Sequence, residues 1–294
     1  MGEVNDSPLV SISLSIITML PTLIVLSLLL LILAYIWGHP LLRYWQHYQI
    51  RQRPFPAAWQ ALLEHRLFFY QYLPRDLQQK LQGAIQVFLA EKQFIGCQGL
   101  VVTDEMKLVI AAQACLISLH QPDSDYPKLS MILVYPNIFK IQRPTALNEY
   151  VLEEQTVVAS GESWGKEGQV ILSWQTIQED LKHPQDGHNV IFHEFAHQLD
   201  QAEHQANGVP RLKTQADYDR WSRIFTAEYQ QLLSQLEQGL PTVIDPYGAT
   251  NPVEFFAVVT ETFFENAQAL VREHRQLYDL LKAFYQLDPL AFYQ

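Results

Sequence analysis

The feature that most constrains this chain is a long uncharged run near its N-terminus. No Asp, Glu, Lys or Arg occurs between Ser7 and Leu42 of the 294 residues, and the stretch Ser15–Trp37 is almost wholly apolar. About 20 consecutive apolar residues are enough for a helix to cross the ~30 Å hydrocarbon core of a membrane. The run therefore predicts one transmembrane helix, which together with a short tail occupies residues 1–38.

A cleaved signal peptide and a buried core helix both fit this run less well. A signal peptide has a basic start and a shorter apolar region, whereas this chain starts with the acidic sequence MGEVNDS and shows no small-residue cleavage pattern after Trp37. A buried helix of a soluble protein rarely lacks charge over such a length. Arg43, Arg51 and Arg53 follow the run and no basic residue precedes it. By the positive-inside rule, we expect a single-pass protein of the cell membrane with its C-terminal bulk on the cytoplasmic side.

The remainder of the chain is expected to be a basic, aromatic juxtamembrane linker (39–57) followed by one domain (58–294). Spacing of apolar residues and end signals indicate an α+β fold, dominated by helices, with a small central sheet. Helices are expected at Arg75–Phe94, Asp104–His120 and about 189–203, 215–238, 252–264 and 267–285. Strands are expected at Gly99–Thr103, Leu129–Tyr135 and Gln169–Trp174, the last of which could border a peptide groove.

Charge and cysteine content exclude several classes of protein. There are 31 acidic and 20 basic side chains, which give a formal net charge of −11. Nucleic-acid-binding domains usually carry a basic surface, so we expect no direct nucleic-acid binding. Two cysteines, Cys97 and Cys115, cannot build a disulfide framework or a four-thiolate metal site. They are expected to be small buried side chains in a reducing compartment, and a single disulfide between them is the alternative.

The sequence VIFHEFAHQLD contains the motif H-E-x-x-H as His193, Glu194 and His197. The i, i+4 spacing places both imidazoles on one face of a helix, where they can bind one Zn²⁺. Glu194 stands beside them, as a general base for a metal-activated water requires. A solvent-facing polar stripe is the alternative, but the surrounding residues are largely apolar. Two histidines and a glutamate inside such a helix need a partner to satisfy them.

A catalytic zinc usually takes three protein ligands, and the spacing leaves two choices for the third. Asn251 followed by Pro252 is typical of a helix start, which puts Glu254 in the first turn and Glu261 two turns later. Glu254 could instead be a capping-box carboxylate, and Glu261 an acid behind the ligands or on the surface. Asp200 lies on roughly the face of the two histidines and could accept an imidazole N–H or be a simple surface acid, so it stays outside the ligand set. Spacing alone does not decide between Glu254 and Glu261.

The segments HEFAHQLD and YGATNPVEFFA resemble the Mlc titration factor A family of zinc-dependent peptidases, and the catalytic domain of anthrax lethal factor has a similar pattern. The likeness extends from about Trp59 to Pro289 through LVYP, SGESW, VILSW, GVP and YQLDP. It implies a zincin-like metallopeptidase domain with one Zn²⁺ per chain. The ligands implied are His193, His197 and Glu254, with Glu194 as general base and Tyr247 as a stabiliser of the oxyanion.

Two departures limit what the resemblance implies. The membrane span is not a feature of the titration-factor group, so a soluble partner complex is not implied. Members of that group also have a histidine that can occupy the metal in a resting form, where this chain has Glu153. Glu153 could bind the metal or belong to a solvated loop. The function expected is a membrane-tethered zinc metallopeptidase that cleaves peptides or exposed protein segments. The alternative is a binding protein that sequesters a transcriptional regulator, with weak or vestigial peptidase activity.

Overall fold

The computed structural model describes residues 8–121, 124–137, 139–148, 151–159, 161–164, 168–201 and 206–293. The chain divides into two compact units, Met1–Arg53 and Pro54–Gln294.

The first unit consists of one long helix, α1 (Pro8–Arg51). Its stretch Ile24–Arg51 contains a window with a mean hydropathy of 2.1 that is 0% buried. At 1.5 Å per residue the 44-residue helix is about 66 Å long, roughly twice the thickness of the hydrocarbon core. The segment 39–57, which was expected to be a linker, is thus helical as far as Arg51. By length and composition alone, α1 could be a membrane anchor or a signal sequence.

The second unit is built around a small sheet with the strand order β1-β2-β6-β5. Strands β1, β2 and β6 are parallel and β5 is antiparallel to β6. The sheet was expected, and the strand expected at Gln169–Trp174 is β6, which lies between β2 and β5. Its place beside a peptide groove stays a prediction. The strands are β1 (Gln93–Gly96), β2 (Met131–Tyr135), β5 (Gly161–Trp164) and β6 (Gln169–Ser173).

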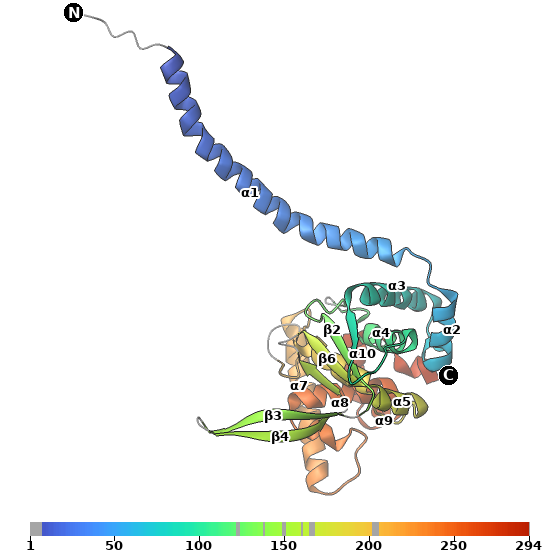
Figure 1. Ribbon diagram of the computed structural model, residues 1–294. Coiled ribbons are helices and arrows are strands. Elements are labelled where there is room, and N and C mark those ends of the chain that lie inside the picture. The colour runs from blue at the N-terminus through green and yellow to red at the C-terminus, as the bar shows by residue number, and fades with distance from the viewer. Residues whose placement is uncertain are drawn as a thin grey trace, which may run out of the picture. The chain divides into compact units, whose positions relative to one another are not determined.

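Two further strands form a separate antiparallel hairpin (Figure 1). They are β3 (Phe139–Asn148) and β4 (Val151–Ala159).

The remaining elements of the second unit are helices, in keeping with the expected helix-dominated fold. They are α2 (Ala57–Arg66), η1 (Tyr70–Tyr72), α3 (Arg75–Glu91), α4 (Asp104–Ser118), α5 (Trp174–Lys182), α6 (Val190–Asp200), α7 (Gln215–Glu237), η3 (Pro246–Ala249), α8 (Pro252–Glu265), α9 (Ala267–Glu273), α10 (Arg275–Tyr285) and η4 (Pro289–Tyr293).

One expected strand is wrong. The segment Gly99–Thr103 is a loop, and the strand lies earlier, at β1. Gln98 and Gly99 both have positive φ angles, 51° and 81°, which turn the chain out of the extended conformation. Thr103 then begins the next helix, because its side chain accepts a hydrogen bond from the amide of Met106.

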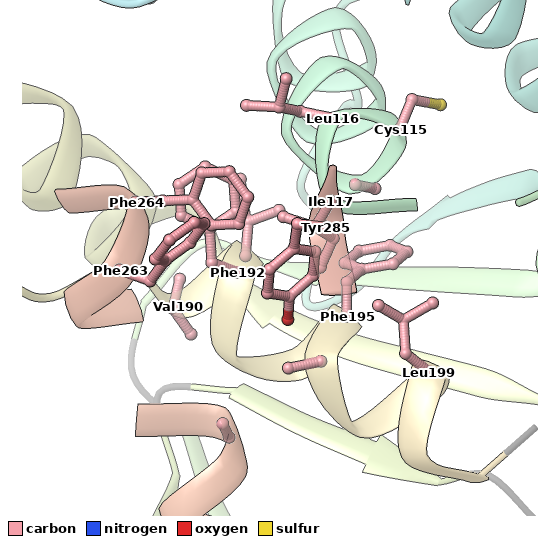
Figure 2. Packing of buried hydrophobic residues seen from close by; sticks show 14 of the residues in the cluster. Cys115, Leu116, Ile117, Val190, Phe192, Phe195, Leu199, Phe263, Phe264 and Tyr285 are labelled. Carbon is pink, nitrogen blue, oxygen red and sulfur yellow. The ribbon is translucent and has the colours of Figure 1, made fainter. Parts of the chain in front are cut away.

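The core holds α6 in place through one apolar face (Figure 2). Phe192 and Phe195 of α6 are buried, together with Leu116 of α4, Phe264 of α8 and Tyr285 of α10. The ring of Phe192 lies 5.0 Å from that of Phe264, centroid to centroid. Because this face of α6 is fixed in the core, the positions of the polar side chains on its other face are fixed as well.

Candidate metal centre

Asn189 is the N-cap residue of helix α6. The side-chain oxygen of Asn189 accepts hydrogen bonds from the amides of Ile191 and Phe192, at 3.1 and 3.0 Å. The amide of Val190 donates to Oδ2 of Asp180 at 2.9 Å. Three of the amides that have no partner within the helix are therefore satisfied, and the start of α6 is fixed.

The two histidines of the H-E-x-x-H motif lie side by side on α6. Their Nε2 atoms are 3.2 Å apart, and the ring planes are nearly perpendicular, at 86°. Both rings are largely buried, with side-chain exposures of 14% for His193 and 10% for His197.

Glu254 approaches this pair from the first turn of α8. Asn251 caps that helix with its own oxygen, which accepts from the amides of Val253 and Glu254. Oε2 of Glu254 lies 3.2 Å from Nε2 of His193 and 3.4 Å from Nε2 of His197.

The three atoms fit the ligand positions of a tetrahedral metal ion. Bonds of about 2.0–2.1 Å to a tetrahedral ion place the ligand atoms about 3.3–3.4 Å from one another. The three separations here are 3.2, 3.2 and 3.4 Å. Two imidazole nitrogens and one carboxylate oxygen leave the fourth position of such an ion for water or substrate.

The electrostatics of the cluster favour a cation at this point. Burial lowers the pKa of His193, but the nearby Glu261, Glu254 and Glu194 outweigh burial and raise it well above the ordinary value. Burial would raise the pKa of Glu254, but hydrogen bonds and positive charge from His193 and His197 hold it well below the ordinary value. A proton or a metal ion can supply the positive charge that these carboxylates stabilise.

Glu261 does not join the three converging atoms. Its Oε1 lies 2.7 Å from Nδ1 of His193, which is the other nitrogen of the ring. Its Oε2 accepts a hydrogen bond of 2.6 Å from the amide of Asn189.

The two residues expected to act on substrate both lie near His193. Glu194 follows it on α6 and is 3% exposed. Tyr247 lies in η3, where Oδ1 of Asp245 accepts from its amide at 2.7 Å. Its ring centroid is 6.0 Å from that of His193 and the residue is 55% exposed. A buried glutamate and a largely exposed tyrosine thus accompany the paired histidines.

Asp200 ties the end of α6 to the start of α8. Its Oδ2 accepts from the amide of Gly208 at 2.9 Å, and within the described residues no hydrogen bond joins it to an imidazole. Gly208 has a φ of 77°, and a Cβ there would lie 2.3 Å from the carbonyl oxygen of Pro252. Only glycine allows the loop to approach α8 so closely.

The sequence did not predict the buried polar cluster around Asn189, which includes Gln113 and Glu265. The side-chain nitrogen of Asn189 donates to Gln113 at 2.6 Å and to Glu265 at 2.8 Å. Burial raises the pKa of Glu265 and of Asp180 to about 7. An asparagine directly before an apolar helical run is an N-cap signal that could have identified Asn189. Nothing in the sequence pairs it with Gln113.

Glu153 lies on β4, where its backbone pairs with that of Thr145. Its side chain lies outside the described part of the chain, so its relation to a metal stays a prediction.

Known proteins with similar sequences share most of the length of this chain. An uncharacterised protein of Synechocystis sp. is 58% identical over 272 residues, which cover 92% of this chain and 99% of that protein. Mlc titration factor A of Serratia proteamaculans is 30% identical over 238 residues (80% of this chain, 88% of that protein). Mlc titration factor A of Pectobacterium atrosepticum is 31% identical over 236 residues (79% and 87%). The sequence profile of the glucose-regulated metallo-peptidase M90 family matches residues 42–286, and the chain belongs to this family of metallopeptidases, whose chemistry implies a divalent metal.

Proposed function

We propose that the protein is a membrane-tethered, zinc-dependent peptidase with a zincin-like domain. The observation that carries the proposal is the convergence of His193 Nε2, His197 Nε2 and Glu254 Oε2 at separations of 3.2–3.4 Å. Two imidazoles and a carboxylate form the ligand set of a catalytic zinc with one open position. The proposal assigns one Zn²⁺ per chain to these three residues.

Zinc bound there would act as a Lewis acid and lower the pKa of a bound water. We assign Glu194 as the general base, because it follows His193 on α6, its charge acts on that imidazole, and its carboxylate can accept a proton from the attacking water. The same carboxylate then returns the proton to the leaving amine. Tyr247 donates a hydrogen bond from its phenol to the oxyanion that develops on the scissile carbonyl.

The proposal also covers the parts of the chain outside the metal centre. Residues 1–38 are the tail and membrane-spanning helix, 39–57 connect it to the domain, and 58–294 are the peptidase domain on the cytoplasmic side. The supporting observations are the exposed apolar surface of α1 within Ile24–Arg51 and the positions of Arg43, Arg51 and Arg53, which all come after the uncharged run that ends at Leu42. The substrate is a peptide or an exposed protein segment.

The names of the relatives favour a second candidate function. Proteins similar to this chain are called Mlc titration factor A, a name that denotes binding of the protein Mlc. By analogy, this chain would sequester a transcriptional regulator, with weak or vestigial peptidase activity. A pure binding protein does not require a buried carboxylate next to the metal ligands, so Glu194 distinguishes the two functions.

The test uses the full chain in detergent micelles. We expect about one zinc per chain, cleavage of a quenched peptide library, and loss of cleavage with a chelator. Glu194→Gln keeps the size of the side chain but removes its basicity, so zinc should stay bound while turnover falls by at least ~10²-fold. Zinc-loaded protein that cleaves no peptide or protein would favour the sequestering function. Wild-type turnover in Glu194→Gln would refute the proposed mechanism.

A further inference from the structure

Helix α8 presents two carboxylates to the same imidazole. Glu254 and Glu261 are separated by about two turns and so lie on similar faces of the helix. Glu254 is 3.2 Å from Nε2 of His193, and Glu261 is 2.7 Å from Nδ1. The ring of His193 is therefore held between a carboxylate at each of its two nitrogens.

The contact at Nδ1 determines which nitrogen carries the hydrogen. A carboxylate accepts hydrogen bonds and does not donate them. Nδ1 must therefore be the protonated nitrogen of a neutral His193, and the lone pair of Nε2 then faces Glu254 and His197. This is the tautomer that a metal ligand bonding through Nε2 requires.

The second oxygen of Glu261 fixes the carboxylate itself. It accepts the amide hydrogen of Asn189, the N-cap of α6, at 2.6 Å. Glu261 is 7% exposed, so water competes little for either oxygen. Glu261 thus contacts both the first residue before α6 and an imidazole one turn further along that helix, and it fixes the orientation of this imidazole.

We infer that Glu261 is a positioning residue for the metal centre, holding His193 with Nδ1 protonated and Nε2 aimed at the metal. The inference deepens the proposed function and rests on it, since it presumes that His193 is a ligand. It assigns Glu261 no bond to the metal, because its oxygens meet the far side of the ring and the backbone of Asn189.

Glu265 provides a matched control on the same helix. Like Glu261, it is a buried carboxylate that binds Asn189, in this case through the side-chain nitrogen at 2.8 Å. Its other oxygen accepts from the amide of Gln185 at 2.9 Å. The two glutamates therefore share the helix, the burial and the contact with Asn189, but only Glu261 contacts a histidine of the centre.

The experiment measures zinc affinity of the full chain in micelles by competition with a chromophoric chelator. Glu261→Gln replaces one acceptor oxygen by an NH₂ group, which must then face either the Nδ1–H or the amide of Asn189. We expect zinc affinity to fall by about 10–100-fold, the usual effect of losing a carboxylate behind a ligand histidine. Glu265→Gln should stay close to the wild type. The visible spectrum of the Co²⁺-loaded protein should change in Glu261→Gln and remain unchanged in Glu265→Gln.

If the glutamine variant does not fold, Glu261→Asp tests the same effect of Glu261 on zinc affinity. It keeps the charge but is one methylene shorter, so it cannot hold both contacts, and zinc affinity should again fall. Wild-type affinity and cobalt spectrum in a folded Glu261 variant would overturn the inference. Equal losses in the Glu261 and Glu265 variants would also overturn it, because they would indicate a general loosening of the helix start. Absence of zinc binding by the wild type would instead refute the proposed function itself.

Discussion

At the scale of single residues, Tyr247 provides the sharpest prediction about the reaction. Its ring lies beside that of His193 but outside the three converging atoms, and it is largely exposed. A phenol in this place can stabilise charge that develops only in the transition state. We expect Tyr247→Phe to leave zinc content unchanged and to lower kcat by about 10²-fold with little change in KM, as loss of one oxyanion donor does.

Steady-state kinetics with one peptide and metal analysis of the same preparation check this expectation. Tyr229→Phe is a suitable control, because that phenol donates to the carbonyl of Ala249 in the same 3₁₀ helix. The control should change stability more than kcat. A rise in KM with constant kcat in Tyr247→Phe would assign the phenol to substrate binding rather than to the oxyanion.

The sequence pointed to the residues of the candidate metal centre, but it did not predict which atoms of these residues meet. The i, i+4 spacing was sufficient to place His193 and His197 on one face, since helix geometry is local. Spacing did not distinguish Glu254 from Glu261, because both lie on the face of α8 turned to α6. Only the packing of the two helices shows that one meets Nε2 and the other Nδ1. The partners Asn189, Gln113 and Glu265 are distant in sequence and could not be paired without the fold.

At the scale of elements, the start of α6 makes stability depend on pH. Burial raises the pKa of Asp180 to about 7, opposed by the amide of Val190 and by His188 and aided by the charges of Glu261 and Asp186. Burial also raises the pKa of Glu265 to about 7, opposed by Gln185 and Asn189 and aided by Asp180 and Asp186. In the unfolded chain such carboxyls lose their protons near pH 4.

Between about pH 4 and pH 7 the folded protein therefore binds more of these protons than the unfolded chain does. The free energy of unfolding should fall as pH rises through this window, by at most about 1.4 kcal/mol per pH unit for each carboxyl, and level off above it. Urea unfolding of the metal-free protein at pH 5, 6, 7 and 8 measures the effect. Glu265→Gln has no proton to lose and should show a shallower fall than the wild type. Identical slopes would show that Glu265 is ionised throughout.

Helices were predictable from the sequence where their end signals and a long periodic pattern of apolar residues lie within the helix itself. The helices α4, α6, α7 and α8 have end signals and extended apolar periodicity, and they lie within a few residues of the expected bounds. The segment 267–285 is two helices, because His274 at φ −130° and ψ 52° interrupts the run. The loop Gly99–Thr103 was mistaken for a strand because two of its apolar residues, Leu100 and Val102, pack against the core although the segment is not a strand. Composition gave no indication of the left-handed turn at Gln98.

At the scale of the whole molecule, the proposed peptidase site and the proposed membrane helix lie in different segments of the chain. The residues of the candidate metal centre all lie between Asn189 and Glu261, inside the second unit. The apolar helix lies in the first unit and has no Asp, Glu or His between Ile24 and Gly38. A protease that acts within the bilayer would need polar residues at that depth. A tether therefore agrees with the chain better than catalysis inside the membrane.

The tether leads to a prediction about sidedness. Orientation of a single span follows the excess of Lys and Arg in its flanks, and here Arg43, Arg51 and Arg53 all follow the apolar run. Protease added to sealed, right-side-out cells should leave the domain 58–294 intact, and permeabilised cells should lose it. Replacing the three arginines by glutamine removes the bias, so part of the variant population should become sensitive in sealed cells. Complete digestion of the wild-type domain from outside, or a mature chain that begins near His39, would contradict a cytoplasmic tether. In the second case α1 would be a signal sequence.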